Sequence, residues 1–327
     1  MGPADRILAE GRREPARVAV LYNRTQEYWR GSWAGAHFNR LLLYLALQHA
    51  HLPTDVIIEE DLTPEALAPY RVVFVQGLNM TRAGLRALRE WVEKGGMVIA
   101  EAGTGWYDEF DEPMEEAETF FGARQRLVGL SEGGFAPAEI SGHTPIDELT
   151  VSETPWTPAG VLPVVGPKVV LEPLEGAEVV GRYRDGTAGA VIRRQGQGKT
   201  LLWGVMLGHL YRQNAPLDEN RKPTRYTAER RAMIVKPVLE EAGRGRVAFS
   251  EPLTEAVLVE HVMGLAICLS DFSERPGAEA VLRIKTDRPV KKVVSAREGP
   301  LPWRREGEHV VIHGRVPAPV DVVVLWE

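Results

Sequence analysis

Residues 71–112 read RVVFVQGLNMTRAGLRALREWVEKGGMVIAEAGTGWYDEFDE, and this stretch decides the fold. Residues 72–75 form an unbroken apolar run, which is typical of a strand buried in a parallel sheet. Thr81 has the residue type of a helix N-cap, and apolar residues follow it at helical spacing up to residue 92. After Lys-Gly-Gly at 94–96, which favours a helix end, residues 97–100 form a second apolar run. The order strand, helix, strand predicts a βαβ unit with parallel strands.

The same alternation is present nearer the N-terminus. Residues 17–22 and 55–58 are further strand-like runs, and residues 37–49 between them have the one apolar face of an amphipathic helix. Repeated alternation of strands and helices predicts an α/β layer. The expected fold class is therefore α/β, with a doubly wound parallel sheet similar to those of flavodoxins and class I amidotransferases.

The rest of the chain changes character. Residues 123–190 are rich in glycine, proline and short β-like runs, and we expect a β-rich insert there. A helix is predicted over residues 227–242, and the short strand patterns that follow it predict a small β-sandwich. We therefore expect an N-terminal arm at 1–16, an α/β domain at 17–244 and a β-sandwich domain at 245–327.

Composition excludes several classes of function. The 327-residue chain has a formal net charge of -6 and scattered basic residues, so no nucleic-acid partner is expected. No apolar run has the length of a membrane span or of a secretory leader, which predicts no membrane association and a cytoplasmic location. Cys268 is the only cysteine, and the 8 histidines lack metal-ligand spacing. We therefore expect no disulfide, no metal and no cofactor.

Residues 196–200 read GQGKT and resemble the end of a phosphate-binding loop. Such a loop needs a glycine where Arg193 stands, and it must open a helix, whereas a strand-like run follows here. We therefore interpret this segment as a hairpin turn.

Ligands of open parallel sheets gather beyond the carboxyl ends of the strands, which places a small-molecule site around residues 101–112. The acidic side chains of this segment are candidates for a catalytic pair or a cation site, and they are Glu101, Asp108, Glu109 and Asp111. In the competing interpretation they cap the helix expected from Met114 and keep the loop soluble. An amidotransferase-type nucleophile is not expected, because neither Cys nor Ser directly follows residues 97–100.

Aromatic side chains near the same edge offer stacking surfaces for a sugar ring. Tyr28, Trp29 and Trp33 belong to residues 23–36, which are expected to form a loop after the first strand, and Trp106 belongs to the acidic segment. The same residue types are enriched at subunit interfaces. A third interpretation is that residues 123–165 fold over the cleft and close it.

Taken together, residues 18–122 resemble the trimerisation domain of the β-galactosidases in glycoside hydrolase family forty-two. The most specific match is TGWYDEFD at 104–111, which is similar to the family's small-Gly-x-x-Asp-Glu-x-Asp segment. LPTDVI at 52–57 and WVEKGG at 91–96 also match. A weaker likeness continues into the C-terminal β-domain and therefore covers most of the chain.

The resemblance implies an amidotransferase-like α/β layer that has lost its catalytic residues. In the family's enzymes a (β/α)8 barrel with two glutamates precedes this region, and we expect that barrel to be absent here. The expected role is non-catalytic: self-assembly, as a trimer by analogy, or docking to a separately encoded glycoside-hydrolase-like chain in carbohydrate metabolism. The alternative is a carbohydrate-binding protein, or a small-molecule or glycoside hydrolase, that uses the strand-end cleft.

Overall fold

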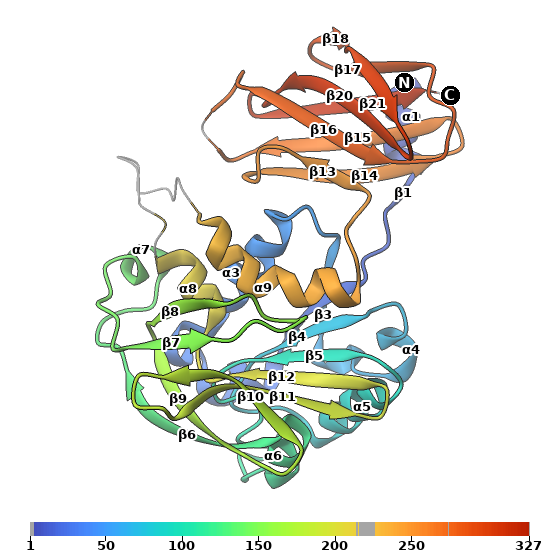
Figure 1. The fold of residues 1–327 in the computed structure, drawn as a ribbon. Coiled ribbons are helices and arrows are strands. Elements are labelled where there is room, and N and C mark those ends of the chain that lie inside the picture. Colours follow the sequence, from blue (N-terminus) through green and yellow to red (C-terminus); the bar gives the residue numbers. More distant parts are fainter. Residues whose placement is uncertain (1–2, 214, 216–225, 274, 327) are drawn as a thin grey trace. The chain divides into compact units, whose positions relative to one another are not determined.

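The computed structural model describes residues 3–213, 215, 226–273 and 275–326 (Figure 1). The chain divides into two compact units. One unit, which we call the α/β unit, comprises Arg17–Ala46 and Thr54–Gly243. The other, the β unit, comprises Met1–Ala16, Leu47–Pro53 and Arg244–Glu327.

The α/β unit is organised around one large mixed sheet. Neighbouring parallel strands follow the order β3 (Thr54–Ile58), β2 (Val18–Tyr22), β4 (Val72–Val75), β5 (Met97–Ala100) and β12 (Gly198–Trp203). Every residue of β4 and β5 is buried, as expected for parallel strands covered on both faces. The predicted βαβ unit is confirmed, because β4 and β5 pair in parallel on either side of the intervening helix.

Antiparallel strands extend this sheet beyond β12. Along the sheet they are β11 (Ala188–Gln195), β10 (Ala177–Tyr183), β7 (Asp147–Val151) and β8 (Gly160–Val164), while β9 (Pro167–Pro173) pairs with β11 and with β6 (Ala123–Leu130). The expected parallel sheet is therefore present only from β3 to β12, as one part of a larger mixed sheet. The strands of residues 123–190 continue the same sheet, and several of them are joined by short turns that allow only antiparallel pairing.

Helices pack against the sheet as the apolar periodicity predicts. α5 (Arg82–Glu93) begins at Thr81, whose Oγ1 accepts a hydrogen bond from Gly84 N at 3.0 Å. Leu88 of α5 is fully buried in the same core cluster as Val98 of β5. The helices expected at residues 37–49, from Met114 and at 227–242 are present, with the bounds α3 (Ala36–Gln48), α6 (Glu115–Phe121) and α9 (Ala228–Glu241). The short helices α4 (Pro64–Leu67) and α7 (Pro137–Ile140) accompany them.

Two helices at the carboxyl ends of the parallel strands differ from the sequence-based expectation. Residues 23–36 contain α2 (Arg24–Arg30) and a 3-10 turn at Trp33–Gly35 instead of a loop. Asn23 caps α2, since its Oδ1 accepts from Gln26 N at 3.0 Å. α8 (Leu207–Gln213) follows β12 and was not expected either. Each helix has only 7 residues, too few for helical periodicity to stand out in the sequence.

The β unit consists of two antiparallel sheets. One has the order β1 (Arg12–Arg13), β14 (Thr254–His261), β15 (Gly264–Asp271), β21 (Val320–Trp326), β17 (Lys292–Ser295) and β18 (Gly299–Pro300), and the other has the order β13 (Val247–Phe249), β16 (Glu279–Lys285), β20 (His309–Arg315) and β19 (Trp303–Glu306). Side chains from both sheets, such as Ile267 and Ile312, share one apolar core, so the unit is a β-sandwich.

The N-terminal segment is part of this β unit. Helix α1 (Pro3–Glu10) leads into β1, which pairs with β14 at the edge of its sheet. Ile7 of α1 is fully buried beside Val259 and Val324. This segment therefore contributes to the packing of the unit.

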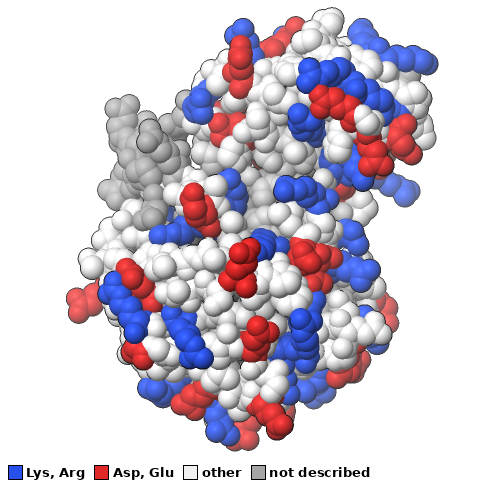
Figure 2. All heavy atoms as spheres, in the orientation of Figure 1, with Lys and Arg blue, Asp and Glu red and all other residues white. Residues whose placement is uncertain are grey.

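The charged surface is mixed in sign. Figure 2 shows Lys and Arg side chains interspersed with Asp and Glu over the visible face, without a broad single-sign patch. A nucleic-acid partner would require a basic stripe or patch, and this face offers none. Among the described residues, no helix is long and apolar enough to cross a membrane.

Candidate functional site

Buried polar side chains fill the carboxyl end of the parallel strands. Asn23, Gln76 and Glu101 each follow a strand directly, and Asn39 reaches them from α3. Asn39 Nδ2 donates to Gln76 Oε1 at 2.6 Å and also to a carboxylate oxygen of Glu101. All four residues are at most 3% exposed. Sequence reasoning singled out only Glu101, although a polar residue directly after an apolar strand is a signal that all three strand-end residues share.

The side chain of Glu101 forms an internal hydrogen bond with α8. Its Oε1 accepts a hydrogen bond from the backbone N–H of Leu207 at 2.6 Å, in the first turn of that helix. Burial raises the pKa of Glu101 to about 8, although hydrogen bonds from Leu207, Asn39 and Gly208 act in the opposite direction. The carboxyl group is 1% exposed. It therefore holds the start of α8 and does not face a substrate in this conformation.

Asp108 shapes its own loop. Its Oδ1 accepts from the backbone N–H groups of Phe110 and Glu112, each at 2.9 Å, and its Oδ2 accepts from Arg82 Nε at 2.8 Å. Burial opposes ionisation, but these backbone and guanidinium donors outweigh it and lower the pKa of Asp108.

Glu109 lies beside the first turn of α5 and accepts from Arg82 N at 2.8 Å. The helix that follows Met114 has no side-chain cap. The interpretation that the acidic segment caps that later helix is therefore wrong for these two carboxylates, which bind the start of α5.

Asp111 joins the acidic loop to α2 and to the segment that follows β4. Its Oδ1 accepts from Asn79 Nδ2 at 2.9 Å and forms an ion pair with Arg30. The described hydrogen bonds give Glu101 no shared partner with Asp108, Glu109 or Asp111. Three of the predicted carboxylates therefore lie in one loop and bind α5, α2 and that loop, whereas Glu101 has a different set of partners.

The four candidate aromatic residues divide into two pairs. Trp33 and Trp106 meet edge to face, with ring centroids 6.2 Å apart. Trp29 donates from Nε1 to the carbonyl of Glu109 at 3.1 Å. Trp29 remains 48% exposed and Tyr28 is 75% exposed. The exposed pair on α2 is available to a partner, whereas the inner pair mainly packs the loops together.

Phe135, which belongs to residues 123–165, packs against residues at the strand-end region. Its ring stacks on His209 of α8 with centroids 5.7 Å apart, and it also packs beside Met206. A Cβ on Gly35 would lie 2.4 Å from the Phe135 Cβ, so glycine permits this close approach. Burial lowers the pKa of His209 to about 4, and the imidazole is therefore neutral near pH 7.

Other sequence features have structural roles. The predicted hairpin is present: residues 196–197 form the turn between β11 and β12, and residues 198–200 begin β12. Lys199 of β12 forms a 2.5 Å ion pair with Glu241. Within the ranges that the structure describes, no three His, Cys, Asp or Glu side chains are placed to hold a metal ion. Cys268 is half-buried in β15, and burial raises the pKa of its thiol.

Comparison with known families matches residues 16–214 to the β-galactosidase trimerisation domain. The matched segment is more than half of the chain. No protein of curated function matches the sequence.

Similar solved structures include large glycosidases. Gan42B, a GH42 β-galactosidase from G. stearothermophilus, has 15% identity and a TM-score of 0.65, with 96% of this chain and 41% of that chain covered. The β-galactosidase of Bacillus circulans sp. alkalophilus has 14% identity, a TM-score of 0.67 and coverage of 98% and 42%. An α-L-fucosidase isoenzyme 2 from Paenibacillus thiaminolyticus has 13% identity, a TM-score of 0.63 and coverage of 98% and 50%. The chain thus spans half or less of the length of these relatives, and the likeness extends through both of its units.

Proposed function

The chain belongs to the β-galactosidase trimerisation domain family, and from this premise we propose that it acts as an assembly or accessory unit of a glycoside hydrolase. It would associate with further copies of itself, as a trimer by analogy, or with a separately encoded glycoside-hydrolase chain. The family match over residues 16–214 is the observation that carries the proposal.

The internal use of the candidate carboxylates supports a non-catalytic role. A general acid or base must reach the reacting atoms within hydrogen-bond distance. Glu101 is instead buried against α8, and Asp108 is held by Arg82 and by backbone N–H groups. Both groups already have the partners that a substrate would have to replace.

Exposed aromatic residues beside the acidic loop support association. Tyr28, Trp29 and Phe110 are 75%, 48% and 72% exposed, and the Trp29–Glu109 hydrogen bond places α2 next to the loop that carries Phe110. Aromatic residues are the ones that most often carry binding energy at protein interfaces. We propose that this aromatic surface contributes to the contact between chains.

The native mass in solution tests self-assembly. Light scattering over a concentration series should give a stable species near 3 × 36.3 = 108.9 kDa. Trp29→Ala combined with Phe110→Ala should shift the mass toward 36.3 kDa, whereas Phe272→Ala, which removes an exposed aromatic of the β unit, should not. A wild-type chain that stays monomeric at high concentration would remove the self-assembly form of the proposal.

The second candidate function is carbohydrate binding or hydrolysis at the strand ends. The observation in its favour is that Tyr28 and Trp29 present exposed rings there. This candidate predicts heat on mixing with a sugar in calorimetry, and loss of that heat in Trp29→Ala with the fold intact. A wild-type chain that releases no heat with any sugar would contradict it.

Three finer predictions accompany the main proposal. The parallel strand order β3-β2-β4-β5-β12 supports a flavodoxin-like and amidotransferase-like layer, since that class places its first strand between its second and third. The domain limits 17–244 and 245–327 stay a prediction for limited proteolysis. The cytoplasmic location also stays a prediction, which fractionation of the producing cells would test.

A further inference from the structure

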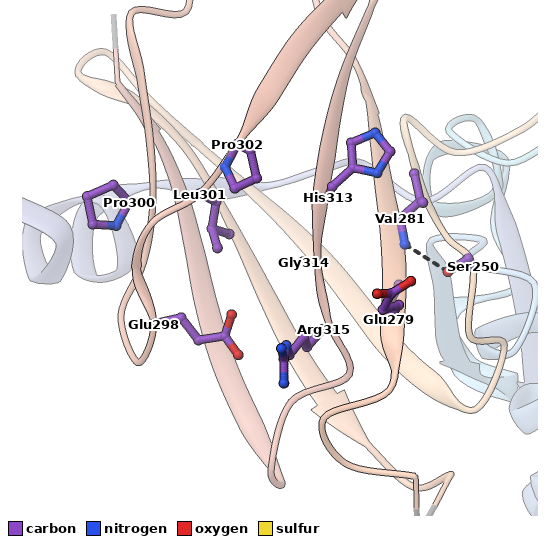
Figure 3. Close-up of a pocket in the computed structure, with 11 residues that line it drawn as sticks. Ser250, Glu279, Val281, Glu298, Pro300, Leu301, Pro302, His313, Gly314 and Arg315 are labelled. Atoms are coloured by element: carbon purple, nitrogen blue, oxygen red, sulfur yellow. Dashed lines mark hydrogen bonds between the residues drawn. The ribbon is translucent and has the colours of Figure 1, made fainter.

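A hollow of about 620 Å³ opens on the β unit, and none of the candidate site residues considered above lines it. Figure 3 shows it between the ends of β16 and β20 on one side and the segment around β18 on the other. Its volume lies in the range typical of small-molecule sites, about 300–1,000 Å³. All of its lining residues belong to the β unit.

Local sequence explains why the hollow exists. β16 and β20 pair so that Ala280 lies opposite Gly314, which puts two of the smallest residues side by side. A Cβ on Gly314 would make only an ordinary van der Waals contact, with Leu301 Cδ1 at 3.9 Å, so the packing beside it is loose. The chain then crosses between the sheets at Leu301 and Pro302, where His313 N donates to the Pro302 carbonyl at 3.1 Å. That hydrogen bond fixes the apolar wall of the hollow.

Charged side chains around the hollow are left without partners. Glu279 and Arg315 are opposite each other in the β16–β20 register, and Glu298 approaches from the turn before β18. In Figure 3 the Glu298 carboxylate points toward Arg315. Within the described part of the chain, these three side chains and that of His313 have no hydrogen bond or ion pair, although many surface charges of the same unit are paired, such as Arg283 with Glu306.

The chemistry of these groups selects a class of ligand. Carboxylates accept hydrogen bonds from hydroxyl groups, and a guanidinium donates to hydroxyl oxygens. Pro300, Leu301 and Pro302 supply an apolar surface beside them. An anionic ligand would face two carboxylates and only one guanidinium, so a neutral ligand is favoured. A ring that carries several hydroxyls on an apolar carbon skeleton satisfies both surfaces.

We propose that this hollow, formed by Glu279, Glu298, Arg315, His313 and the wall at 300–302, is a binding site for a neutral saccharide. The carboxylates accept from its hydroxyl groups, Arg315 donates to them, and the carbon face of the ring lies on the wall. The site is distinct from the strand-end region of the α/β unit and does not depend on the assembly role. We expect weak binding, with a Kd on the order of 1 mM, as is usual for a small ligand in an open site.

Ligand-observed NMR on the full chain tests the proposal, with galactose, lactose and cellobiose as probes and galacturonate as the anionic comparison. At least one neutral sugar should show saturation transfer, and galacturonate should show less. Glu298→Gln should weaken binding at least tenfold, because it removes an acceptor charge without changing the shape. The matched control Glu308→Gln removes an exposed carboxylate of the same unit that forms an ion pair with Lys285, and it should bind like the wild type.

A second variant tests the shape of the hollow without changing its charge. Gly314→Val adds side-chain atoms beside Leu301 without a close backbone contact and suits a strand, so the variant should keep its circular dichroism spectrum and lose sugar binding. Trp29→Ala, in the α/β unit, should keep it. The proposal is wrong if no neutral sugar binds, if Gly314→Val binds like the wild type, or if Trp29→Ala alone abolishes binding.

Discussion

Replacing Glu101 with glutamine should change how the stability of the α/β unit depends on pH. Burial raises the pKa of Glu101 from 4.5 to about 8. Between these values the folded chain keeps a proton that the unfolded chain releases, so the free energy of unfolding falls as pH rises. At about 1.4 kcal/mol per pKa unit, the full shift corresponds to roughly 5 kcal/mol. Glutamine has no proton to lose and cannot show this dependence.

The difference in the free energy of unfolding between the wild type and Glu101→Gln reports the titration of Glu101 alone. Glutamine keeps the shape of the protonated carboxyl but has one acceptor oxygen where Glu101 has two. The cost of that lost acceptor does not depend on pH, so it sets a constant offset between the two proteins, measured at pH 5. From pH 5 to pH 7.5 it should gain roughly 3 kcal/mol relative to the wild type, since about one proton is involved over that window. Other titrating groups occur in both proteins and cancel in the difference.

Urea denaturation followed by tryptophan fluorescence measures this difference at half-unit steps of pH. Glu175→Gln, which changes an exposed carboxylate in a turn, is the control and should track the wild type at every pH. If the difference between Glu101→Gln and the wild type stays constant from pH 5 to pH 7.5, Glu101 does not carry the proton that its burial implies, and the reasoning fails.

Further predictions concern the helix cap Thr81, the core residue Leu88 and the buried His209. Thr81→Ala should lower the free energy of unfolding by about 1 kcal/mol in urea, because the N-cap bond to Gly84 is lost; Thr81→Ser should restore most of it. Leu88→Ala should cost roughly 2–5 kcal/mol in the same assay, since Leu88 is fully buried, and a loss under 1 kcal/mol would contradict this packing. His209 has its pKa lowered from 6.5 to about 4, so its contribution to stability is present above pH 6.5 and is lost as pH falls toward 4, by roughly 3 kcal/mol. His209→Gln should reduce the loss of stability between pH 6.5 and pH 4. If the variant loses as much stability as the wild type, other groups cause that loss.

Strand and helix positions were predictable wherever the pattern was local and long enough. The run at 72–75, the Thr81 cap and the apolar positions up to residue 92 predict β4 and α5, and the structure has both. The hairpin at residues 196–200 was predictable for the same reason, because the absence of the glycine that a phosphate-binding loop requires and the strand-like run that follows are both visible in the sequence. The short helices α2 and α8 were not predicted, since 7 residues give too few helical repeats to show an apolar face.

The location of the candidate site was predictable from the sequence, but the hydrogen-bond partners of its carboxylates were not. A parallel sheet places residues that follow its strands at one edge, so the sequence located Glu101 and the acidic loop there. Their partners come from distant positions: Leu207 lies 106 residues from Glu101, and Arg30 lies 81 residues from Asp111. No local pattern indicates that these donors occupy the carboxylates.

The sequence alone determined the alternation of strands and helices, the β-sandwich pattern and the likeness to the trimerisation domain family, because each depends on periodicity and short motifs along the chain. Only the tertiary structure decided that residues 123–190 extend the same sheet, that Glu101 holds α8, and that Glu279, Glu298 and Arg315 surround one hollow. Strand pairing and side-chain contacts depend on which distant segments meet, and burial then decides whether a charged group is paired, neutral or free to bind.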